Sequence, residues 1–495
     1  MAAGKGFHLK KNRENRRQQK SGEQDAGEEF HEGLVLEGLA RSRTRTKKDP
    51  CQNRRRFGVA LAYPFYLMSE IAPPDTVSST PANTRFLWSI TLFILVAGIL
   101  FRICPSAGFT GAGFDEVLYR DNVIKLEKVG ILNYPAICQV YLEDQRDPKS
   151  ITKLPPTRFL YIYTSYLWKR TAFGDAPPAN PRAPGFARRD PVLISLRHVG
   201  CLFSCLTLIA SGLCAWRMLG LRALPPVLAL MSCAPVQIHF AQHALIDGVF
   251  TFWATMCLWL LWENLRHPND ARRLAVYGLC LGLMVITKEN SFFVFLGLAG
   301  LIGVNRLAKF GTVTSKLLLV SIVGPLAGVT LLVALAGGIG DFVEIYRMLV
   351  GKAETLQYAV LTGDGPWYRY LVDILLVSPL VLILAIGGVF TQVRTNRAYV
   401  FLVAFVGFTY LIMCNVRYGM NLRYASIWEL PLRVMAAAQI GALSARFGSR
   451  QTLVATLAIV ALCAYDLRQY YIYFMDFGLY ELVTEGLVRA VKILK

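Results

Sequence analysis

Charged side chains are scarce in this chain of 495 residues: they make up 17% of it, against about 25% in an average soluble domain. Acidic residues are the scarcer kind, since 33 Asp and Glu stand against 53 Lys and Arg, and 54% of the residues are hydrophobic. This balance excludes a secreted disulfide scaffold, a coiled coil and a wholly disordered chain. It is typical of a membrane protein, in which long uncharged segments alternate with basic connections.

The net charge of +20 raises the alternative of nucleic-acid binding. The basic residues do not lie on one continuous soluble stretch, which such a function would favour. In a polytopic membrane protein a basic excess usually reflects the positive-inside bias of cytoplasmic loops. We therefore expect no nucleic-acid partner.

Residues 1–57 are rich in Lys, Arg, Gln and Glu and nearly free of aromatic and β-branched residues, which is typical of disorder. No small-residue cleavage site follows their short apolar patch, so we do not interpret the segment as a signal peptide. We expect residues 1–85 to be a basic cytoplasmic N-terminus. Met68 would itself begin an ordinary short leader, so an over-long gene prediction covering residues 1–67 stays open beside a native extension.

From Phe86 onward, apolar runs of about twenty residues recur, long enough to cross about 30 Å of hydrocarbon as helices. They predict an all-α polytopic membrane protein with about 11 transmembrane helices, a membrane domain at residues 86–468 and a short C-terminal tail at 469–495. The runs are 86–103, 191–216, 223–240, 248–265, 274–287, 290–305, 317–338, 370–391, 398–415, 427–444 and 451–468.

Basic residues predict the orientation, because they cluster in alternate short connections, which the positive-inside rule assigns to the cytoplasm. The N-terminus falls on the same side. The remaining connections then face outward, into a periplasm or lumen if the chain lies in a plasma (inner) membrane or its equivalent. These outward segments are 104–190, 239–247, 339–369 and 416–424.

The first outward loop, residues 104–190, contains two segments that we expect to lie at the membrane interface. Residues 115–129 alternate apolar and charged positions as an amphipathic helix does, and residues 159–168 are aromatic but too short to span. The loop also holds Cys104 and Cys138. A disulfide between them, or two free thiols, both stay open.

Asp115 and Glu116 form the first candidate site, where two adjacent carboxylates open the amphipathic segment. In a partly desolvated site, a carboxylate has a raised pKa and is a better general base. In a wet site, Asp115 would simply cap the helix and Glu116 would be a first-turn residue favoured by the helix dipole.

Asp247 is the second candidate, because it lies between two apolar runs without a basic neighbour, where an ionisable group is costly and suggests function. The alternative is a helix N-cap. His239 and His243, four residues apart, could share a divalent metal with Asp247. The sequence defines no further ligand, so no cofactor is certain.

Three cations form the third candidate site, together with Tyr424. Lys288, Arg417 and Arg423 all fall in connections assigned to the outward side, where the positive-inside bias works against them. They could bind a phosphate near the membrane surface. Snorkelling to lipid headgroups is the alternative for any one of them.

The order of these motifs along the chain resembles the polytopic GT-C glycosyltransferases, in particular the dolichyl-phosphate-mannose protein mannosyltransferases and the lipid A aminoarabinose transferases. The resemblance extends from about Phe86 to Ala438. It rests on Asp115-Glu116 after the first run, Pro155-Pro156 before the aromatic stretch, Phe173-Gly174, Leu196-Arg197 opening the second run, Pro235 through Asp247, Thr287-Lys288, and Arg423-Tyr424 ahead of Leu430-Pro431.

The resemblance implies an enzyme that moves a hexose or pentose, with inversion, from an undecaprenyl- or dolichyl-phosphate donor to a lipid, glycan or protein acceptor. It implies that Asp115 is the catalytic base with Glu116 beside it, that Asp247 helps to bind an acceptor or a metal, and that Lys288 or Arg423 stabilises the departing phosphate. Thr157-Arg158 departs from the apolar residue that usually follows the two prolines.

A transporter or flippase of lipid-linked sugars is the alternative function, since it would also have many spans and a polar outward cavity. Transporters often have inverted repeats and ionisable residues at mid-membrane. We find no internal symmetry, and the ionisable residues cluster toward one surface. These observations favour the transferase.

Overall fold

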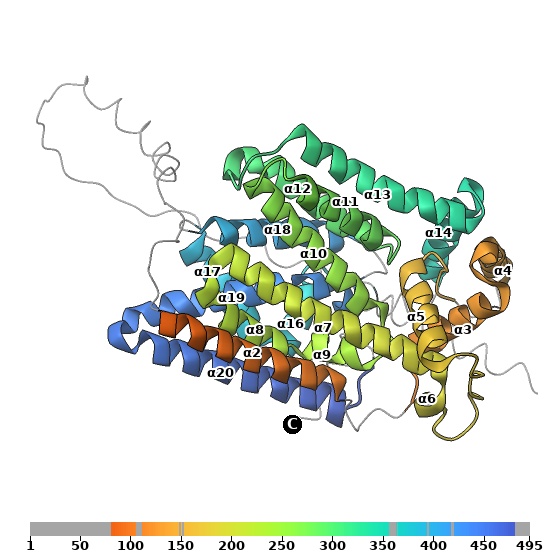
Figure 1. Ribbon diagram of the computed structural model, residues 1–495, viewed down its shortest axis with the longest axis horizontal. Coiled ribbons are helices and arrows are strands. Elements are labelled where there is room, and N and C mark those ends of the chain that lie inside the picture. The colour runs from red at the N-terminus through yellow and green to blue at the C-terminus, as the bar shows by residue number, and fades with distance from the viewer. Residues whose placement is uncertain are drawn as a thin grey trace, which may run out of the picture. The chain divides into compact units, whose positions relative to one another are not determined.

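The computed structural model describes residues 81–104, 111–147, 150, 153–355, 363, 365–393, 396–416 and 420–480. They belong to one compact unit, Pro74–Lys495. Within these ranges the regular elements are all helices, as predicted (Figure 1). The predictions for residues 1–80, including a start at Met68, and for Arg417 lie outside the described residues.

The longer helices are α2 (Pro81–Ile103), α3 (Phe114–Val129), α4 (Tyr134–Arg146), α5 (Phe159–Phe173), α7 (Pro191–Leu219), α8 (Leu224–Ser232), α9 (Pro235–Gln242), α10 (Ile246–Arg266), α11 (Ala271–Val285), α12 (Ser291–Ala308), α13 (Ser315–Ala336), α14 (Ile339–Thr355), α16 (Arg369–Val377), α17 (Pro379–Gln392), α18 (Arg397–Met413), α19 (Glu429–Ser444) and α20 (Gln451–Tyr470). The shorter ones are η2 (Ile131–Asn133), α6 (Phe186–Arg189), η3 (Leu221–Ala223), η4 (Leu422–Trp428), η5 (Ala445–Arg450) and η6 (Tyr471–Asp476).

Five stretches of the described chain are long and apolar enough to cross a membrane, or six if α8 and α9 form one bent span. The chain is therefore a multi-pass membrane protein, although the expected count of eleven spans is not confirmed. The five are Thr84–Ile103, Pro191–Leu219, Ser291–Ala308, Ser315–Ala336 and the run of helices Leu422–Asp476.

Proline breaks two of the expected runs. The run 223–240 becomes α8 and α9, bent by 58° just before Pro235, and the run 370–391 becomes α16 and α17, which meet at Ser378 and Pro379. Proline lacks the N–H of a helix interior and its ring clashes with the preceding turn, so a helix ends ahead of it. An apolar run shows its length but not this change of direction.

Arg102, near the end of α2, donates to carbonyl groups where α8 ends. Its Nη2 donates to the carbonyl oxygen of Met231 at 2.9 Å, and its Nη1 donates to that of Ser232 at 3.4 Å. Four last-turn carbonyls of a helix lack intrahelical partners. The buried guanidinium thus ties the first apolar helix to the break between α8 and α9.

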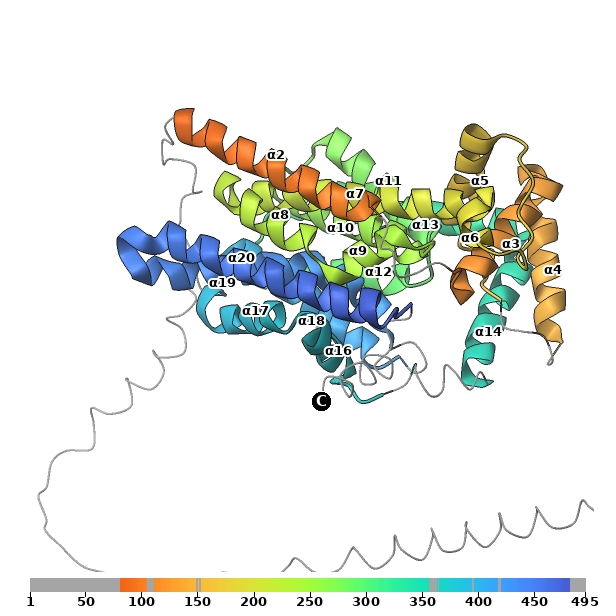
Figure 2. The same ribbon diagram turned by 90° about the horizontal axis from the view of Figure 1, so that it is seen from below.

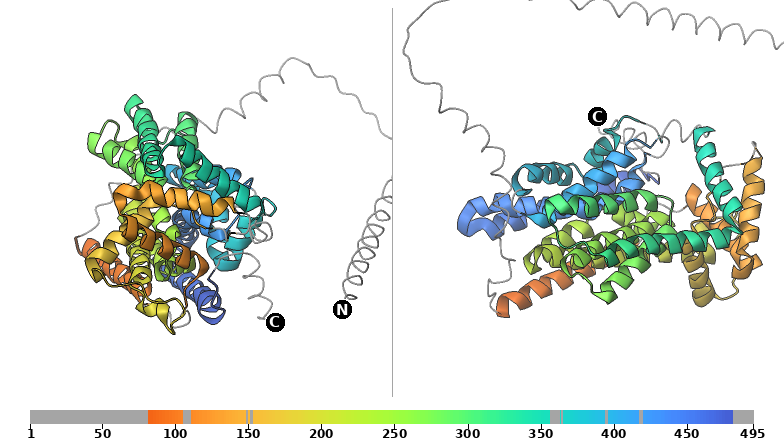
Figure 3. Two further views of the ribbon diagram at one scale, coloured as in Figure 1. Left: turned by 90° about the vertical axis from the view of Figure 1, so that its right-hand side faces the viewer. Right: turned by 90° about the horizontal axis from the view of Figure 1, so that it is seen from above.

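Helix α7 is central to the part of the fold that forms the site, because it packs against α2, α3, α5, α8, α9 and α10. Helices α3, α4, α5, α6 and α14 gather at one end of the bundle (Figures 2 and 3). The two expected interfacial segments correspond to α3 and α5. Helices α4 and α14 were not predicted, because charges interrupt their apolar positions.

Helices α11 and α13 approach each other closely through glycines. A Cβ atom added to Gly324 would lie 2.6 Å from the carbonyl oxygen of Gly278, and one added to Gly328 would lie 2.7 Å from that of Gly282. Small residues allow such close contact between membrane helices, where the hydrophobic effect contributes little.

Cys104 and Cys138 are both free thiols. Cys138 is buried, with its sulfur 3.7 Å from the carbonyl oxygen of Leu335 in α13, whereas Cys104 is exposed. The alternative of a disulfide between them is therefore wrong.

Candidate active site

Four positions far apart in the sequence meet at one site. They are the first turn of α3, the first turn of α10, the connection between α11 and α12, and η4. Ion pairs join these positions: Arg423 of η4 pairs with Asp115 and lies near Asp247, and Lys288 pairs with Asp247. Three of the four expected outward segments, 104–190, 239–247 and 416–424, thus converge, together with the connection that contains Lys288, whereas no described residue of 339–369 takes part in these ion pairs.

Asp115 faces Arg423 and does not cap its helix. The N-cap of α3 is Gly113, so the interpretation of Asp115 as an N-cap is wrong. Its Oδ2 accepts a hydrogen bond of 2.7 Å from Nη1 of Arg423, and its side chain is 12% exposed. Within the described ranges, Arg423 is the only cation paired with it.

Asp247 is buried and paired rather than capping. The N-cap of α10 is Leu245, so that alternative is wrong as well. Oδ1 of Asp247 accepts a hydrogen bond of 2.6 Å from Nζ of Lys288, and both side chains are 2% exposed. Its Oδ2 lies 3.9 Å from Nη1 of Arg423, so Arg423 lies between two carboxylates.

Lys288 and Arg423 can each donate a further hydrogen bond to an anion. The ammonium group of Lys288 also lies 4.3 Å from the centre of the Tyr424 ring, a cation–π contact, and one carboxylate oxygen accepts from it. Burial lowers the pKa of Lys288, while the charge of Asp247 opposes that shift. Nε of Arg423 is buried without a hydrogen-bond partner among the described residues, and such a donor is costly to leave unpaired.

Glu116 is enclosed by donors. Its carboxylate accepts both a 3.0 Å and a 2.8 Å hydrogen bond from Arg197, and one of 2.7 Å from the N–H of Gly113 and one of 2.6 Å from that of Ala244. Burial alone would raise the pKa of Glu116, but His243 and Arg197 together hold it well below its usual range. The side chain is a fixed anion that joins the start of α3 to α7 and α9.

Three further residues, Tyr119, Arg158 and Glu289, extend the site and were not among the candidates predicted from the sequence. Arg158 pairs with Glu289, and its Nη1 donates to the hydroxyl of Tyr119 at 2.7 Å. Arg158 and Glu289 are 131 positions apart, so no local pattern could have linked them. Two features of the sequence could have pointed to these residues. Arg158 follows the two prolines, and Glu289 is next to Lys288.

The charges of the extended site balance, which lowers the free-energy cost of burying them. Three cations, Arg158, Lys288 and Arg423, stand against three carboxylates. Each of the six takes part in an ion pair. An unpaired charge at this depth would be costly. The carboxylates are those of Asp115, Asp247 and Glu289.

His239 and His243 lie together in an aromatic cluster. Their ring centres are 4.4 Å apart, and His239 stacks on Phe474 at 4.3 Å. Nε2 of His239 lies 3.0 Å from the carbonyl oxygen of Tyr480. In the described part of the chain, no group of three or more His, Cys, Asp or Glu side chains is placed to hold a metal ion.

No family model and no curated protein matches this chain in sequence. Among solved structures, it is similar to ArnT from Cupriavidus metallidurans in the apo state, at 12% identity and a TM-score of 0.43, over 83% of this chain and 75% of that one. For ArnT bound to undecaprenyl phosphate, the identity is 12% and the TM-score 0.45, over the same shares of the two chains.

The chain is also similar to the archaeal oligosaccharyltransferase AglB from Archaeoglobus fulgidus in complex with an inhibitory peptide and a dolichol-phosphate. The identity is 12% and the TM-score 0.47, over 83% of this chain and 56% of that one, so the chain spans little more than half of AglB. ArnT and AglB are GT-C glycosyltransferases. Likeness at this level carries no argument about activity, which rests on the residues themselves.

Proposed function

We propose that this protein is a membrane glycosyltransferase that moves a sugar from an undecaprenyl- or dolichyl-phosphate donor to a hydroxyl group of an acceptor. The observation that carries the proposal is the direct contact of Arg423 with Asp115, beside the buried pair of Lys288 and Asp247. It puts a carboxylate that can take a proton next to cations that can hold a phosphate. Glycosyl transfer from a phosphate needs both groups at one place.

In the proposed reaction, Asp115 accepts the proton of the acceptor hydroxyl while the acceptor oxygen forms a bond to the anomeric carbon of the sugar. The bond between that carbon and the phosphate oxygen breaks, and the polyprenyl phosphate leaves with the electron pair. Lys288 and Arg423 stabilise the charge on the leaving phosphate. Attack from the face opposite the phosphate inverts the anomeric centre.

Arg423 has a second part in this proposal. Its Nη1 donates to Oδ2 of Asp115 at 2.7 Å, so the same guanidinium lies within reach of the base and of a bound phosphate. A bound phosphate would draw the guanidinium toward itself. Asp115 would then be released to accept a hydrogen bond from the acceptor hydroxyl.

Asp247 and Glu116 are positioning residues in this account. Asp247 holds Lys288 at 2.6 Å, and Glu116 anchors the first turn of α3 and thereby the backbone of Asp115. No step is assigned to a metal ion, because the described residues offer no group of three suitable side chains. The N-terminus is proposed to be cytoplasmic and the site to face outward, as the distribution of basic residues predicts.

The donor class tests the proposal. Purified protein in lipid nanodiscs is given a membrane extract and either a labelled polyprenyl-phosphate sugar or the same sugar on a nucleotide. We expect only the lipid-linked sugar to be transferred, with one polyprenyl phosphate released for each glycosylated product. Transfer from the nucleotide alone would refute the proposal, and so would movement of the intact lipid-linked sugar across sealed vesicles without cleavage, which would support the transporter.

A further inference from the structure

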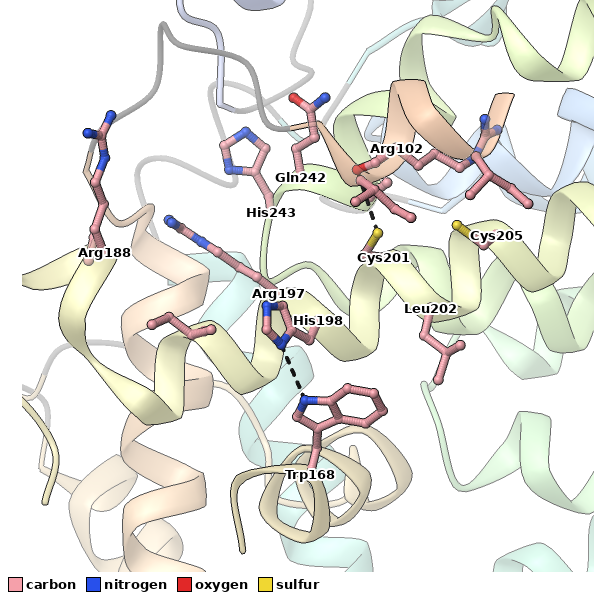
Figure 4. Close-up of a pocket in the computed structure, with 15 residues that line it drawn as sticks. Arg102, Trp168, Arg188, Arg197, His198, Cys201, Leu202, Cys205, Gln242 and His243 are labelled. Carbon is pink, nitrogen blue, oxygen red and sulfur yellow. Dashed lines mark hydrogen bonds between the residues drawn. The ribbon is translucent and has the colours of Figure 1, made fainter. Parts of the chain in front are cut away.

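A cavity of about 770 Å³ lies beside the proposed site, between α2, α5, α6, α7 and α9 (Figure 4). Its size is that of a small-molecule site. The lining contains three arginines and two histidines but no carboxylate. Its lining residues include Ile103, Arg188, Arg197, Leu202 and His243.

One side of the cavity is cationic. Figure 4 shows Arg188, Arg197 and His243 gathered on this side, away from Cys201 and Leu202. Arg188 is exposed on α6, and no acidic side chain of the described chain pairs with it. The charge of Arg188 therefore complements an anion, while that of Arg197 is shared with Glu116.

Arg102 also lines the cavity, but its guanidinium is directed away from it (Figure 4). Each nitrogen of that guanidinium donates to the protein, to Ser204 Oγ at 3.1 Å and to backbone carbonyl oxygens such as that of Gly98 at 2.9 Å. Arg188, and Nη1 of Arg197, whose Nε and Nη2 donate to Glu116 and the carbonyl oxygen of Gly111, are thus the arginine groups available to a ligand.

The opposite side is apolar and borders the membrane. Ile103 belongs to α2 and Leu202 to α7, both long and apolar enough to span, and these side chains are 58% and 41% exposed. On a membrane-spanning helix, exposed apolar side chains face lipid. A ligand that uses both sides of the cavity would carry an anionic head and a hydrocarbon tail that extends into the bilayer.

Arg197 connects this cavity to the proposed active site. Its guanidinium lines the cavity and donates to Glu116 at 2.8 Å, the residue next to Asp115. Lys288 and Arg423, which the proposal assigns to the donor phosphate, belong to the connection between α11 and α12 and to η4, and neither lines the cavity. The Asp115-Glu116 pair thus lies between the donor cations and this second cationic site.

We infer that the cavity is the acceptor subsite and that the acceptor is a membrane lipid with an anionic, hydroxyl-bearing headgroup. This inference rests on the proposed function and deepens it. Arg188 and Arg197 bind the anionic group, the tail lies along Ile103 and Leu202, and the hydroxyl of the headgroup is presented to Asp115.

Photo-crosslinking tests the inference with two probes, phosphatidylglycerol and phosphatidylcholine, each with a diazirine in one acyl chain. Leu202→Trp fills the apolar side, and Leu213→Trp adds the same bulk to a lipid-exposed position of α7 outside the cavity. Arg188→Gln removes the exposed cation, and the neighbouring exposed Arg189→Gln, outside the lining, removes an equal charge.

We expect phosphatidylglycerol, but not phosphatidylcholine, to label peptides of α2 and α7 in the wild type. Labelling should fall about tenfold in Leu202→Trp and Arg188→Gln, since each loses part of a site that needs both head and tail, and should persist in Leu213→Trp and Arg189→Gln. Equal labelling by the two probes, or equal losses in each pair of variants, would overturn the inference.

Consumption of a labelled polyprenyl-phosphate sugar is measured in parallel. If the wild type consumes the donor but the cavity variants retain phosphatidylglycerol, the inference fails and the proposed function stands. If the variants lose phosphatidylglycerol but the wild type never consumes the donor, the proposed function fails, and with it the role of the cavity as an acceptor subsite.

Discussion

At the scale of single residues, Arg423 is the group that joins the site, since it contacts Asp115 at 2.7 Å and lies 3.9 Å from Asp247. All three side chains are largely buried, so their charges interact more strongly than they would in water. Loss of one partner leaves the others uncompensated, which is costly. Variants of these residues must therefore be judged for folding as well as for activity.

Replacement of Lys288 by Met is expected to reduce sugar transfer about a hundredfold, the usual cost of removing one group that stabilises a developing charge. The buried Lys169 of α5, paired with Glu127 of α3, offers a matched control. Lys169→Met should lower the thermal midpoint but retain transfer per folded molecule. The double variant Asp247→Asn with Lys288→Met, which leaves no unpaired carboxylate, should fold better and remain inactive; recovered transfer would contradict the role of Lys288.

Replacement of Glu116 by Gln is expected to destabilise the protein by about 3 kcal/mol at neutral pH, as for a broken buried ion pair. The folded pKa of Glu116 lies below its ordinary value of 4.5, so its stabilising contribution is present above that pH and is lost as the pH falls through the folded pKa. Thermal midpoints in detergent at pH 7 and below pH 4.5 test this. The difference between wild type and variant should shrink in acid; a constant difference would contradict the ion-pair account.

The residues that the sequence revealed are ionisable side chains beside apolar runs. Asp247, Lys288 and Arg423 stand out there because charge is costly near a membrane, whereas Asp115 stood out because it and Glu116 open the amphipathic segment. Arg158 did not, because its partner Glu289 lies 131 positions away and long-range pairing leaves no mark on local composition.

At the scale of helices, apolar length predicted where most elements lie, and two of the expected runs break at Pro235 and Pro379, although Pro325 lies inside α13. Helices α2, α7 and α13 follow the expected runs closely, whereas the runs around Pro235 and Pro379 divide into shorter helices. The close contact between α11 and α13 depends on glycines that hydropathy does not distinguish from other apolar residues.

Gly324→Ala is expected to separate α11 from α13, because the new Cβ would lie 2.6 Å from a backbone oxygen of Gly278. We expect a loss of about 1–3 kcal/mol, as for other overpacked contacts, seen as a lower thermal midpoint in detergent. Gly303→Ala in α12 is the control, since its Cβ would meet nothing within 4 Å. Equal midpoints for the two variants would show that this contact does not stabilise the fold.

At the scale of the whole molecule, the alternation of basic connections predicted that four distant segments share one side of the membrane. The structure brings three of these segments together at Asp115, Asp247 and Arg423, joined by Lys288 of the connection between α11 and α12, while no described residue of 339–369 takes part in these ion pairs. The number of spans between two connections is enough for this prediction, because every second connection of a multi-pass chain lies on the same side of the membrane. The side itself stays a prediction.

Cysteine labelling tests the orientation. Asp175→Cys places a thiol at an exposed position of the 104–190 loop, where the side chain is 93% exposed, and Asn269→Cys places one at an exposed position between α10 and α11. With Cys104 replaced by Ser, a membrane-impermeant maleimide added to intact cells should label the first variant alone. Labelling of the Asn269→Cys variant alone would show that the orientation is the reverse of the predicted one.

The rate of sugar transfer by Asp115→Asn tests the central claim most directly. Wild type, Asp115→Asn and Asp121→Asn are compared at equal folded concentration with a labelled polyprenyl-phosphate sugar, Asp121 being a 55% exposed carboxylate on the same helix. The account predicts a loss of about 10²–10⁴-fold for Asp115→Asn, the range of general-base catalysis, and wild-type transfer for Asp121→Asn. Transfer by Asp115→Asn at the wild-type rate would contradict it.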